Sequence, residues 1–378
     1  MRYYNHNDDN APCDHYHNYR DDNHDDNAAR DHYHDPVIDQ SLPQRECRQQ
    51  RAGHKDVPSS ITDSDVPART VLKKTMDTTT ANLLDALTPD VERLLNRHQD
   101  SARLWYPHLQ IDWGSGEDFT RRPWDPGDYA LDPAVRSAIY VNLLTEDNLP
   151  YYTSEILSHA YPEHPLTDWN HQWTMEENRH AMMMRDWVHI SRCIDPTLLE
   201  DGRRVQMTRA IVPHPGSLAD LICYVTFQER ATQIAHRNTM ARLDRDDKTG
   251  RGVLGLIAGD ETRHFMFYRD LTSAAFEVDP STLTIAVYTQ AAAFAMPGTG
   301  IPNFTRHAVR IARAGIYGLP QFLGILVPLL AQWDIEHLAG LSPEAERARD
   351  ALVGLVADLT ARAARQAQHA AQSALRTD

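Results

Sequence analysis

The sequence has few cysteines and fewer basic than acidic residues, and both shortages exclude classes of protein. Four cysteines occur in 378 residues without the paired spacing of a zinc site, so we expect free thiols in a reducing cytoplasm. The formal net charge of −15 argues against a nucleic-acid-binding protein. An apolar run from Gly315 to Ala331 contains two prolines and is shorter than the roughly 20 residues of a membrane span. We therefore expect no membrane span and interpret this run as a core element or the wall of a cleft.

Residues 1–75 contain very few of the large aliphatic side chains that build a core. They are rich in Asp and Asn and hold seven of the 20 histidines. Because such a segment cannot bury enough apolar surface to offset the entropy of ordering, we expect a disordered extension, with metal binding by its histidines as the alternative. It has no apolar stretch typical of a secretory signal and is too acidic for a transit peptide. Met76, just before the first amphipathic spacing, is a candidate start; we assign residues 76–345 to one domain and 346–378 to a C-terminal helix.

Two near-identical pentapeptides carry the most informative pattern in the chain. Residues 176–180 read Glu-Glu-Asn-Arg-His, and residues 260–264 read Asp-Glu-Thr-Arg-His. Each places a Glu and a His three residues apart, on one face of a helix, where a carboxylate and an imidazole can bind one metal ion. Glu-x-x-His by itself is a weak motif. It becomes informative here because the same five-residue pattern occurs twice.

Two further glutamates complete a known arrangement. Glu146 precedes Glu177 by 31 residues, and Glu229 precedes Glu261 by 32, which fits two helical hairpins joined by a crossover. One Glu from each of two helices and a Glu-x-x-His from each of the other two form the di-metal site of ferritin-like bundles. We therefore predict an all-α fold, a ferritin-like four-helix bundle with additional helices. The expected helices span 81–99, 134–157, 168–194, 197–210, 216–244 and 251–276, with an irregular segment at 100–133 and further helices over 281–378.

Each of these acidic or histidine residues continues an apolar stripe of its helix. Val135, Ile139 and Leu143, for example, lead at helical spacing to Glu146. A charge on a core stripe is costly unless it is paired or binds a metal. Two divalent metals would balance four converging carboxylates, whereas buried ion pairs with satisfied histidines are the alternative interpretation. Mixed oxygen and nitrogen ligands favour iron or manganese over copper or structural zinc.

Four segments resemble the soluble acyl-[acyl-carrier-protein] desaturases, a di-iron family of plant plastids and actinobacteria. They are Leu-Thr-Glu-Asp-Asn-Leu-Pro (144–150), Trp-Thr-Met-Glu-Glu-Asn-Arg-His (173–180), Thr-Phe-Gln-Glu-Arg-Ala-Thr (226–232) and Asp-Glu-Thr-Arg-His (260–264). The segment around Trp124 resembles a conserved tryptophan segment of that family, and the likeness extends from about residue 80 to about residue 340. The chain departs from plastid members at Ala181 and Phe265, where they have Gly and Glu.

The resemblance implies an enzyme that introduces a cis double bond into a fatty acyl chain carried by acyl carrier protein. It implies O₂ as oxidant, ferredoxin as electron donor, a cytoplasmic homodimer and two Fe²⁺ ions, with manganese as the alternative metal. Glu177 and Glu261 are expected to bridge the two metals. The full ligand set implied by the resemblance is Glu146, Glu177, His180, Glu229, Glu261 and His264.

The resemblance also implies roles for three residues that are not metal ligands. Thr232 matches a family threonine suited to hydrogen-bonding bound oxygen, although its hydroxyl could equally donate to a carbonyl of its own helix. Trp124 and Asp260 match residues that link an iron-bound histidine to the surface, with ordinary packing as the alternative for Trp124. An acyl chain needs an apolar channel, for which the candidates are Leu143, Met184, Val225, Phe227 and Ile257.

Two other functions remain open from the sequence. One is a di-iron oxygenase acting on another substrate, such as a hydroxylase or an N-oxygenase; the latter typically has an additional histidine ligand, for which no candidate is obvious. The other is a ferritin-like metal-binding protein without turnover. An acidic carrier protein would also need a local basic surface on this chain. The alternative for the candidate residues is an ordinary solvated face. The candidates are Arg237, Arg242, Arg245 and Lys248.

Overall fold

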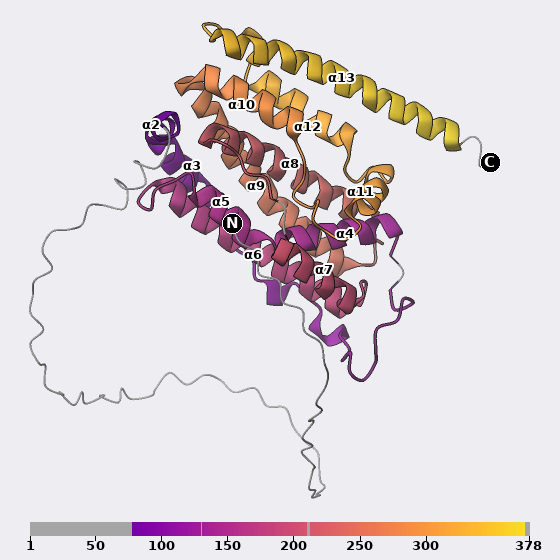
Figure 1. Ribbon diagram of the computed structural model, residues 1–378. Coiled ribbons are helices and arrows are strands. Elements are labelled where there is room, and N and C mark those ends of the chain that lie inside the picture. The colour runs from indigo at the N-terminus through magenta and orange to yellow at the C-terminus, as the bar shows by residue number, and fades with distance from the viewer. Residues whose placement is uncertain (1–77, 130, 210–211, 375–378) are drawn as a thin grey trace, which may run out of the picture. The chain divides into compact units, whose positions relative to one another are not determined.

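The computed structural model describes residues 78–129, 131–209 and 212–374, and its described part is helical (Figure 1). The extension predicted for residues 1–75 lies outside the described residues. The α-helices are α2 (Thr78–Ala86), α3 (Thr88–Ser101), α4 (Pro133–Glu146), α5 (Leu149–Leu157), α6 (Pro165–Ser191), α7 (Pro196–Arg209), α8 (Leu218–Arg242), α9 (Lys248–Val278), α10 (Pro280–Ala293), α11 (Phe304–Arg313), α12 (Leu319–Gln332) and α13 (Pro343–Ala374). No strand occurs among these residues, so the all-α prediction is confirmed.

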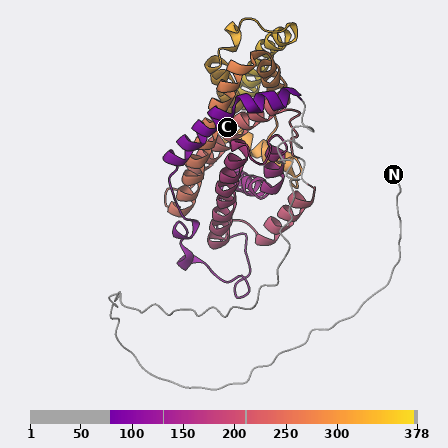
Figure 2. The same cartoon turned by 90° about the vertical axis from the view of Figure 1, so that its left-hand side faces the viewer.

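Four of these helices, α4, α6, α8 and α9, form the centre of the bundle. The turn at 243–247 folds α9 back along α8, and these two helices share the most extensive packing in the described chain. Helix α6 packs against both α4 and α9. In Figures 1 and 2, α10, α12 and α13 lie along one side of this group, and α13 packs against α10 and α12.

Local sequence signals place the starts of these helices. Ser217 caps α8 by accepting a hydrogen bond from the backbone N–H of Asp220, and Asp247 caps α9 through the N–H of Gly250. Gly250 also allows a close approach between helices, because a Cβ atom there would lie 2.3 Å from the Trp187 ring on α6. The capped start of α9 therefore rests directly on α6.

Two of the expected helices are each divided in two. The segment expected as one helix at 81–99 forms α2 and α3, and the one at 134–157 forms α4 and α5. A proline follows each break: Pro89 and Pro150 both occupy the first turn of the second helix, where the missing N–H is tolerated. Because the apolar spacing continues across both breaks, periodicity alone does not reveal them.

The other expected elements agree with the structure within a few residues. Residues 102–132 contain only two short 3₁₀ helices, η1 (Pro107–Leu109) and η2 (Trp113–Ser115), as expected for an irregular segment. The apolar run near residues 315–331 forms most of α12 and contributes Phe322, Ile325, Leu326 and Leu329 to the core. Among the described helices, none combines the length and apolarity that crossing a membrane requires.

Candidate metal centre

Six buried side chains from four helices meet at the centre of the bundle. Glu146 ends α4, Glu177 and His180 come from α6, Glu229 from α8, and Glu261 and His264 from α9; none is more than 7% exposed. Their ligand atoms fall into two groups, each lying within 4.8 Å of one another. One group is Glu146, Glu177, His180 and Glu261, and the other is Glu177, Glu229, Glu261 and His264.

The two groups share Glu177 and Glu261, so these two carboxylates face both halves of the site. The Nδ1 atom of His180 lies 3.4 Å from an oxygen of Glu177 and 3.5 Å from one of Glu261. The Nδ1 atom of His264 lies 2.9 Å and 3.8 Å from the other oxygens of the same two residues. Glu146 and Glu229 each face one half only. This is the arrangement expected if Glu177 and Glu261 bridge two metals.

The unpaired atoms of the site fit metal binding. Each histidine uses its outer nitrogen, Nε2, for a hydrogen bond to another carboxylate, and its inner nitrogen, Nδ1, has no hydrogen-bond partner. Both oxygens of Glu261 and one each of Glu177 and Glu229 are likewise buried without a partner. Buried polar atoms rarely remain unsatisfied unless a ligand completes them. Imidazole and carboxylate groups are suitable ligands for iron or manganese.

The electrostatics of the site show how closely the six groups depend on one another. Burial, aided by the neighbouring carboxylates, raises the pKa values of Glu146 and Glu229 well above the usual range. Burial opposes charge on the two histidines as well, but the surrounding carboxylates outweigh it and raise the pKa values of His180 and His264. For Glu261, burial is outweighed by the two neighbouring histidines, so its pKa is lowered. Without metals, Glu146, Glu229 and the two histidines thus favour their protonated forms, whereas Glu261 favours its charged form.

A hydrogen-bonded chain leads outward from His180, and its tryptophan is not the one predicted. The Nε2–H of His180 donates to Asp260 over 3.1 Å, and the indole N–H of Trp105 donates to the same oxygen, also over 3.1 Å. The Trp105 ring lies nearly parallel to His180, and the guanidinium of Arg179 covers it at 4.0 Å. Asp260 therefore lies where the sequence predicted, with Trp105 as its partner.

Trp124 is not part of this hydrogen-bonded chain, although the sequence predicted that it would help to link the histidine to the surface. Its indole N–H donates over 2.8 Å to the carbonyl of Arg192, the residue that ends α6 in the left-handed conformation. Trp124 thus ties the irregular segment to the end of α6. The segment has no periodicity from which to decide which of its tryptophans faces the bundle.

The two tryptophans provide a direct comparison. We expect Trp105→Phe to weaken iron binding by about tenfold, because Asp260 then holds His180 less firmly, as is typical of residues around metal ligands. Trp124→Phe should leave iron affinity unchanged and lower the free energy of unfolding by about 1 kcal/mol for the lost hydrogen bond. Chelator competition measures the first effect and denaturant unfolding the second. Equal iron affinity in both variants would remove Trp105 from the site.

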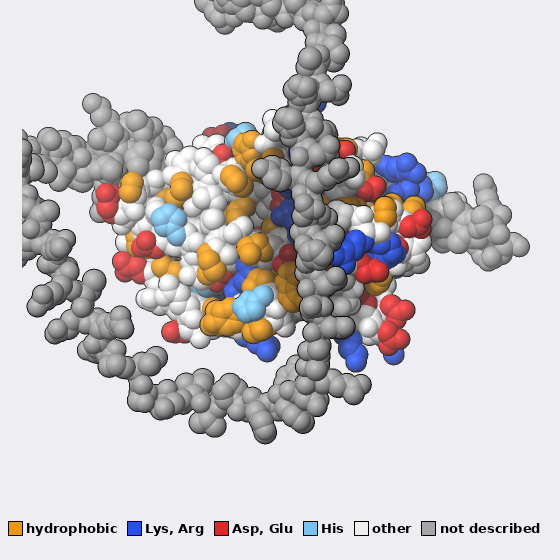
Figure 3. All heavy atoms as spheres, turned by 90° about the horizontal axis from the view of Figure 1, so that it is seen from below, with side chains coloured by type: hydrophobic (Ala, Val, Ile, Leu, Met, Phe, Trp, Pro, Cys, Tyr) orange, Lys and Arg blue, Asp and Glu red, His pale blue; other side chains and the backbone are white. Residues whose placement is uncertain are grey.

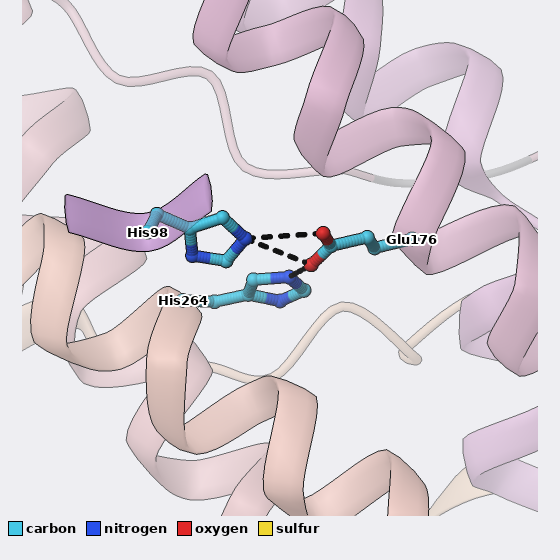
Figure 4. A group of neighbouring side chains, drawn as sticks. All are labelled: His98, Glu176 and His264. Carbon is cyan, nitrogen blue, oxygen red and sulfur yellow. Dashed lines mark hydrogen bonds and ion pairs between the residues drawn. The ribbon is translucent and has the colours of Figure 1, made fainter. Parts of the chain in front are cut away.

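Two further residues, Glu176 and His98, hold the outer nitrogen of His264 in a hydrogen-bonded group that the sequence did not suggest (Figure 4). Its Nε2–H donates to Glu176 over 2.8 Å, and His98 of α3 donates to both oxygens of that carboxylate, over 3.0 and 3.1 Å. Burial opposes ionisation of Glu176, but these two histidines outweigh it and lower its pKa. Three such residues could themselves hold a metal. Because the Glu176 carboxylate already accepts hydrogen bonds from both histidines, we interpret Glu176 and His98 as supports of His264.

Two residues of α8 lie one turn apart next to the site. The hydroxyl of Thr232 donates to the carbonyl of Gln228, which is the alternative role considered for it from the sequence. His236 is fully buried, and its Nε2 lies 3.6 Å from an oxygen of Glu146. Burial lowers the pKa of His236 to about 4, so it is neutral at pH 7. Sequence reasoning missed His236, although it follows Glu229 by seven residues, on the same face of the helix.

Two apolar hollows border α8 near the metal centre. The first is lined by Trp173, whose indole N–H donates to Glu229, together with Tyr152, Val225 and Gln228. The second lies between α4, α8 and α11 and is lined by Asn142 and Thr145, close to Glu146 in α4.

Of the five side chains predicted to line a channel, Val225 borders the first hollow. The other four are almost completely buried within the two apolar cores of the bundle rather than lining either hollow: Leu143, Met184, Phe227 and Ile257. Their apolar stripes therefore indicated burial correctly but did not distinguish packing from a channel.

Comparisons with known proteins agree with this geometry. A model of the fatty acid desaturase family matches residues 79–377. A Mycobacterium tuberculosis protein named as an acyl-[acyl-carrier-protein] desaturase, DesA1, is 36% identical over 293 residues, which cover 74% of this chain and 86% of that protein. The chloroplastic stearoyl-[acyl-carrier-protein] 9-desaturase 1 of Arabidopsis thaliana is 32% identical over 234 residues, covering 57% of this chain and 59% of the plant protein.

A solved structure supports the fold. The X-ray structure of DesA2 from Mycobacterium tuberculosis, also named as an acyl-ACP desaturase, matches with a TM-score of 0.57 and 26% sequence identity. The match covers 71% of this chain and 99% of DesA2. Together with the helical architecture, this similarity confirms the predicted ferritin-like fold.

Proposed function

This chain belongs to the fatty acid desaturase family, and from that premise we propose that it uses two iron ions to introduce a cis double bond into an acyl chain. The observation that carries the proposal is the pair of carboxylates, Glu177 and Glu261, shared by two ligand groups. Glu146 and His180 would hold one iron and Glu229 and His264 the other, and Glu177 and Glu261 would be available to both. Manganese remains the alternative metal for this ligand set.

The irons provide chemistry that protein side chains do not have. When bound, two ferrous ions deliver two electrons together to O₂ and so provide the oxidising power to remove hydrogen from an unactivated methylene. One O₂, two electrons and two protons, with two hydrogens from adjacent methylenes, give the double bond and two water molecules. The electrons come from a one-electron donor such as ferredoxin.

The protein provides position and a water-poor environment for this reaction. His180 and His264 are each held by an outer carboxylate, which fixes the direction of the ring nitrogen that faces the metals. The first hollow reaches Trp173 and Gln228, and the second reaches Thr145, so both approach the site along α8. We place the acyl chain along these hollows, past Thr232. Hydrogen bonds through Asp260 link Trp105 to His180 and so hold the ring of His180 in place beside the site.

The substrate follows from the relatives. The names of two plant relatives specify stearoyl and palmitoyl groups on acyl carrier protein, and we propose the same class of thioester for this chain. We also propose a homodimer, as in the sequence prediction. The comparisons do not favour the oxygenase alternative, and the six complete ligands count against a protein without turnover.

The reaction has a direct test. Iron-loaded protein should convert stearoyl- or palmitoyl-carrier protein, with ferredoxin, its reductase and O₂, to a product lighter by two hydrogens, as a two-electron oxidation demands. Mass spectrometry of the released acyl group measures this change. A gain of one oxygen would instead support a hydroxylase, and no product from any acyl carrier by a loaded, O₂-reactive protein would reject the desaturase proposal.

A further inference from the structure

One long segment of this acidic chain contains no acidic residue. Between Asp279 and Asp334 there is neither Asp, Glu nor Lys, and the only arginines are Arg306, Arg310 and Arg313. In a chain with a net charge of −15, this segment is locally basic. It covers α10, α11 and α12, and all three arginines belong to α11.

The three arginines share one face of α11. They are spaced four and three residues apart, which places them on the same side of a helix. Arg306 and Arg313 are exposed, Arg310 is half-buried, and Val309 lies between them with 43% of its surface exposed. These four residues border a shallow groove together with Phe304 and Ile301. We call this surface the α11 face.

The arginines of the α11 face differ from other arginines on the surface. Arg93, Arg203 and Arg242, for example, each lie within 3.2 Å of a carboxylate oxygen. Within the described part of the chain, Arg306, Arg310 and Arg313 form no ion pair and no side-chain hydrogen bond. Their charges are therefore available to a partner. Figure 3 shows one face of the molecule, on which Lys and Arg side chains stand among Asp and Glu.

The opposite side of α11 borders the second hollow. Phe304, Ala308 and Ala312 line it from α11, and Asn142 and Thr145 line it from α4, beside which α11 lies in Figure 1. Thr145 directly precedes Glu146, one of the six site residues. A basic face and an apolar route toward the metal centre thus meet at a single short helix.

We infer that the α11 face is the docking surface for an acidic acyl carrier, whose acyl chain enters the hollow beneath the helix. This inference rests on the proposed function, since it concerns the delivery of that substrate. Three unpaired guanidinium groups complement the acidic surface and the phosphate of the carrier's phosphopantetheine arm, and guanidinium binds phosphate oxygens well. Val309 provides an apolar contact within this charged ring.

The surface predicted from the sequence is less suited to this task. Arg242 is already paired with Asp132 and also donates to the carbonyl of Ala314, directly after α11. Arg245 lies between Asp244 and Asp246, so its charge is locally compensated. The charges of Arg242 and Arg245 are therefore already compensated within the protein.

The test compares two triple charge reversals on the complete, iron-loaded protein. Arg306→Glu, Arg310→Glu and Arg313→Glu change the α11 face; Arg347→Glu, Arg362→Glu and Arg365→Glu make the same charge change at exposed sites of α13. Binding of stearoyl-carrier protein is measured anaerobically without reductant, so that no turnover occurs. We expect the α11 variant to bind at least about tenfold more weakly and the α13 variant to bind as the parent does. Raising the salt concentration should weaken binding by the parent more than by the α11 variant.

Turnover measurements separate docking from chemistry. In the α11 variant, KM for the acyl carrier should rise while kcat at saturation and iron content stay unchanged, because no substituted residue touches the metal site. Equal binding by the parent and the α11 variant, or equal losses in both triple variants, would overturn the inference. Binding without desaturation by the parent would reject the proposed reaction alone. If the charge reversals prevent folding, the corresponding Arg→Gln triple gives the same comparison with a smaller expected effect.

Discussion

Replacing Glu261 with alanine is expected to leave the protein with almost no bound iron, where the parent should bind about two ions per chain, as a two-metal site of this type does. Glu261 belongs to both ligand groups, so its loss removes a ligand from each metal at once. Glu229→Ala removes a ligand from one group only and should retain about one iron per chain. Metal analysis after anaerobic loading, followed by removal of loosely bound iron, gives both numbers.

The same helix offers a matched control for this experiment. Glu277, near the end of α9, is exposed and belongs to neither group, so Glu277→Ala should bind iron as the parent does. Circular dichroism of the metal-free variants checks that each helix bundle has formed. Retention of about two irons by Glu261→Ala would contradict the two-metal assignment.

Iron loading is also expected to release protons, because metals bind deprotonated ligands. Burial raises the pKa values of Glu146 and Glu229, and carboxylate partners overcome burial to raise those of His180 and His264. In the metal-free protein, each of these four groups therefore favours the form that carries a proton. Each must lose it to bind a metal, so iron affinity should rise with pH.

Calorimetric titration in buffers of different ionisation enthalpy measures the protons released. Glu277→Ala should release the same number as the parent, which assigns the protons to the buried cluster rather than to the surface. A release near zero, or an affinity that does not change between pH 6 and pH 8, would show that the metal-free ligands are already deprotonated. The measurement does not depend on turnover.

The six candidate ligands could be found from the sequence because helical geometry links spacing to direction. Glu177 and His180 share a face whenever their segment is helical, and the apolar stripes show that this face is buried. Their convergence in space then follows from packing four such stripes together. The same reasoning would have found His236, which continues the stripe through Glu229 and Thr232.

Other parts of the site depend on contacts between separate elements, which the helical periodicity of the sequence does not predict. Trp105 and Trp124 both lie outside regular helices, and only the path of the chain decides that Trp105 reaches Asp260. His98 follows Val91 and Leu94 on a core stripe of α3, yet its partner Glu176 lies on another helix. The division between α4 and α5 was missed because the apolar spacing continues through it. Long-range packing, rather than local preference, determined these features.

The contact between Gly250 and Trp187 couples the start of α9 to residues much farther along that helix. Glu261 follows Gly250 by eleven residues, or about 16 Å along the axis, at the rise of an α-helix. A methyl group at position 250 would clash with the buried indole ring of Trp187 on α6. Because a helix is stiff, the resulting displacement would extend along α9. Asp260, Glu261 and His264 would then move as one body relative to Glu177 and His180. A mutation of Gly250, which belongs to neither group of ligands, would therefore change the spacing of the two halves of the metal centre.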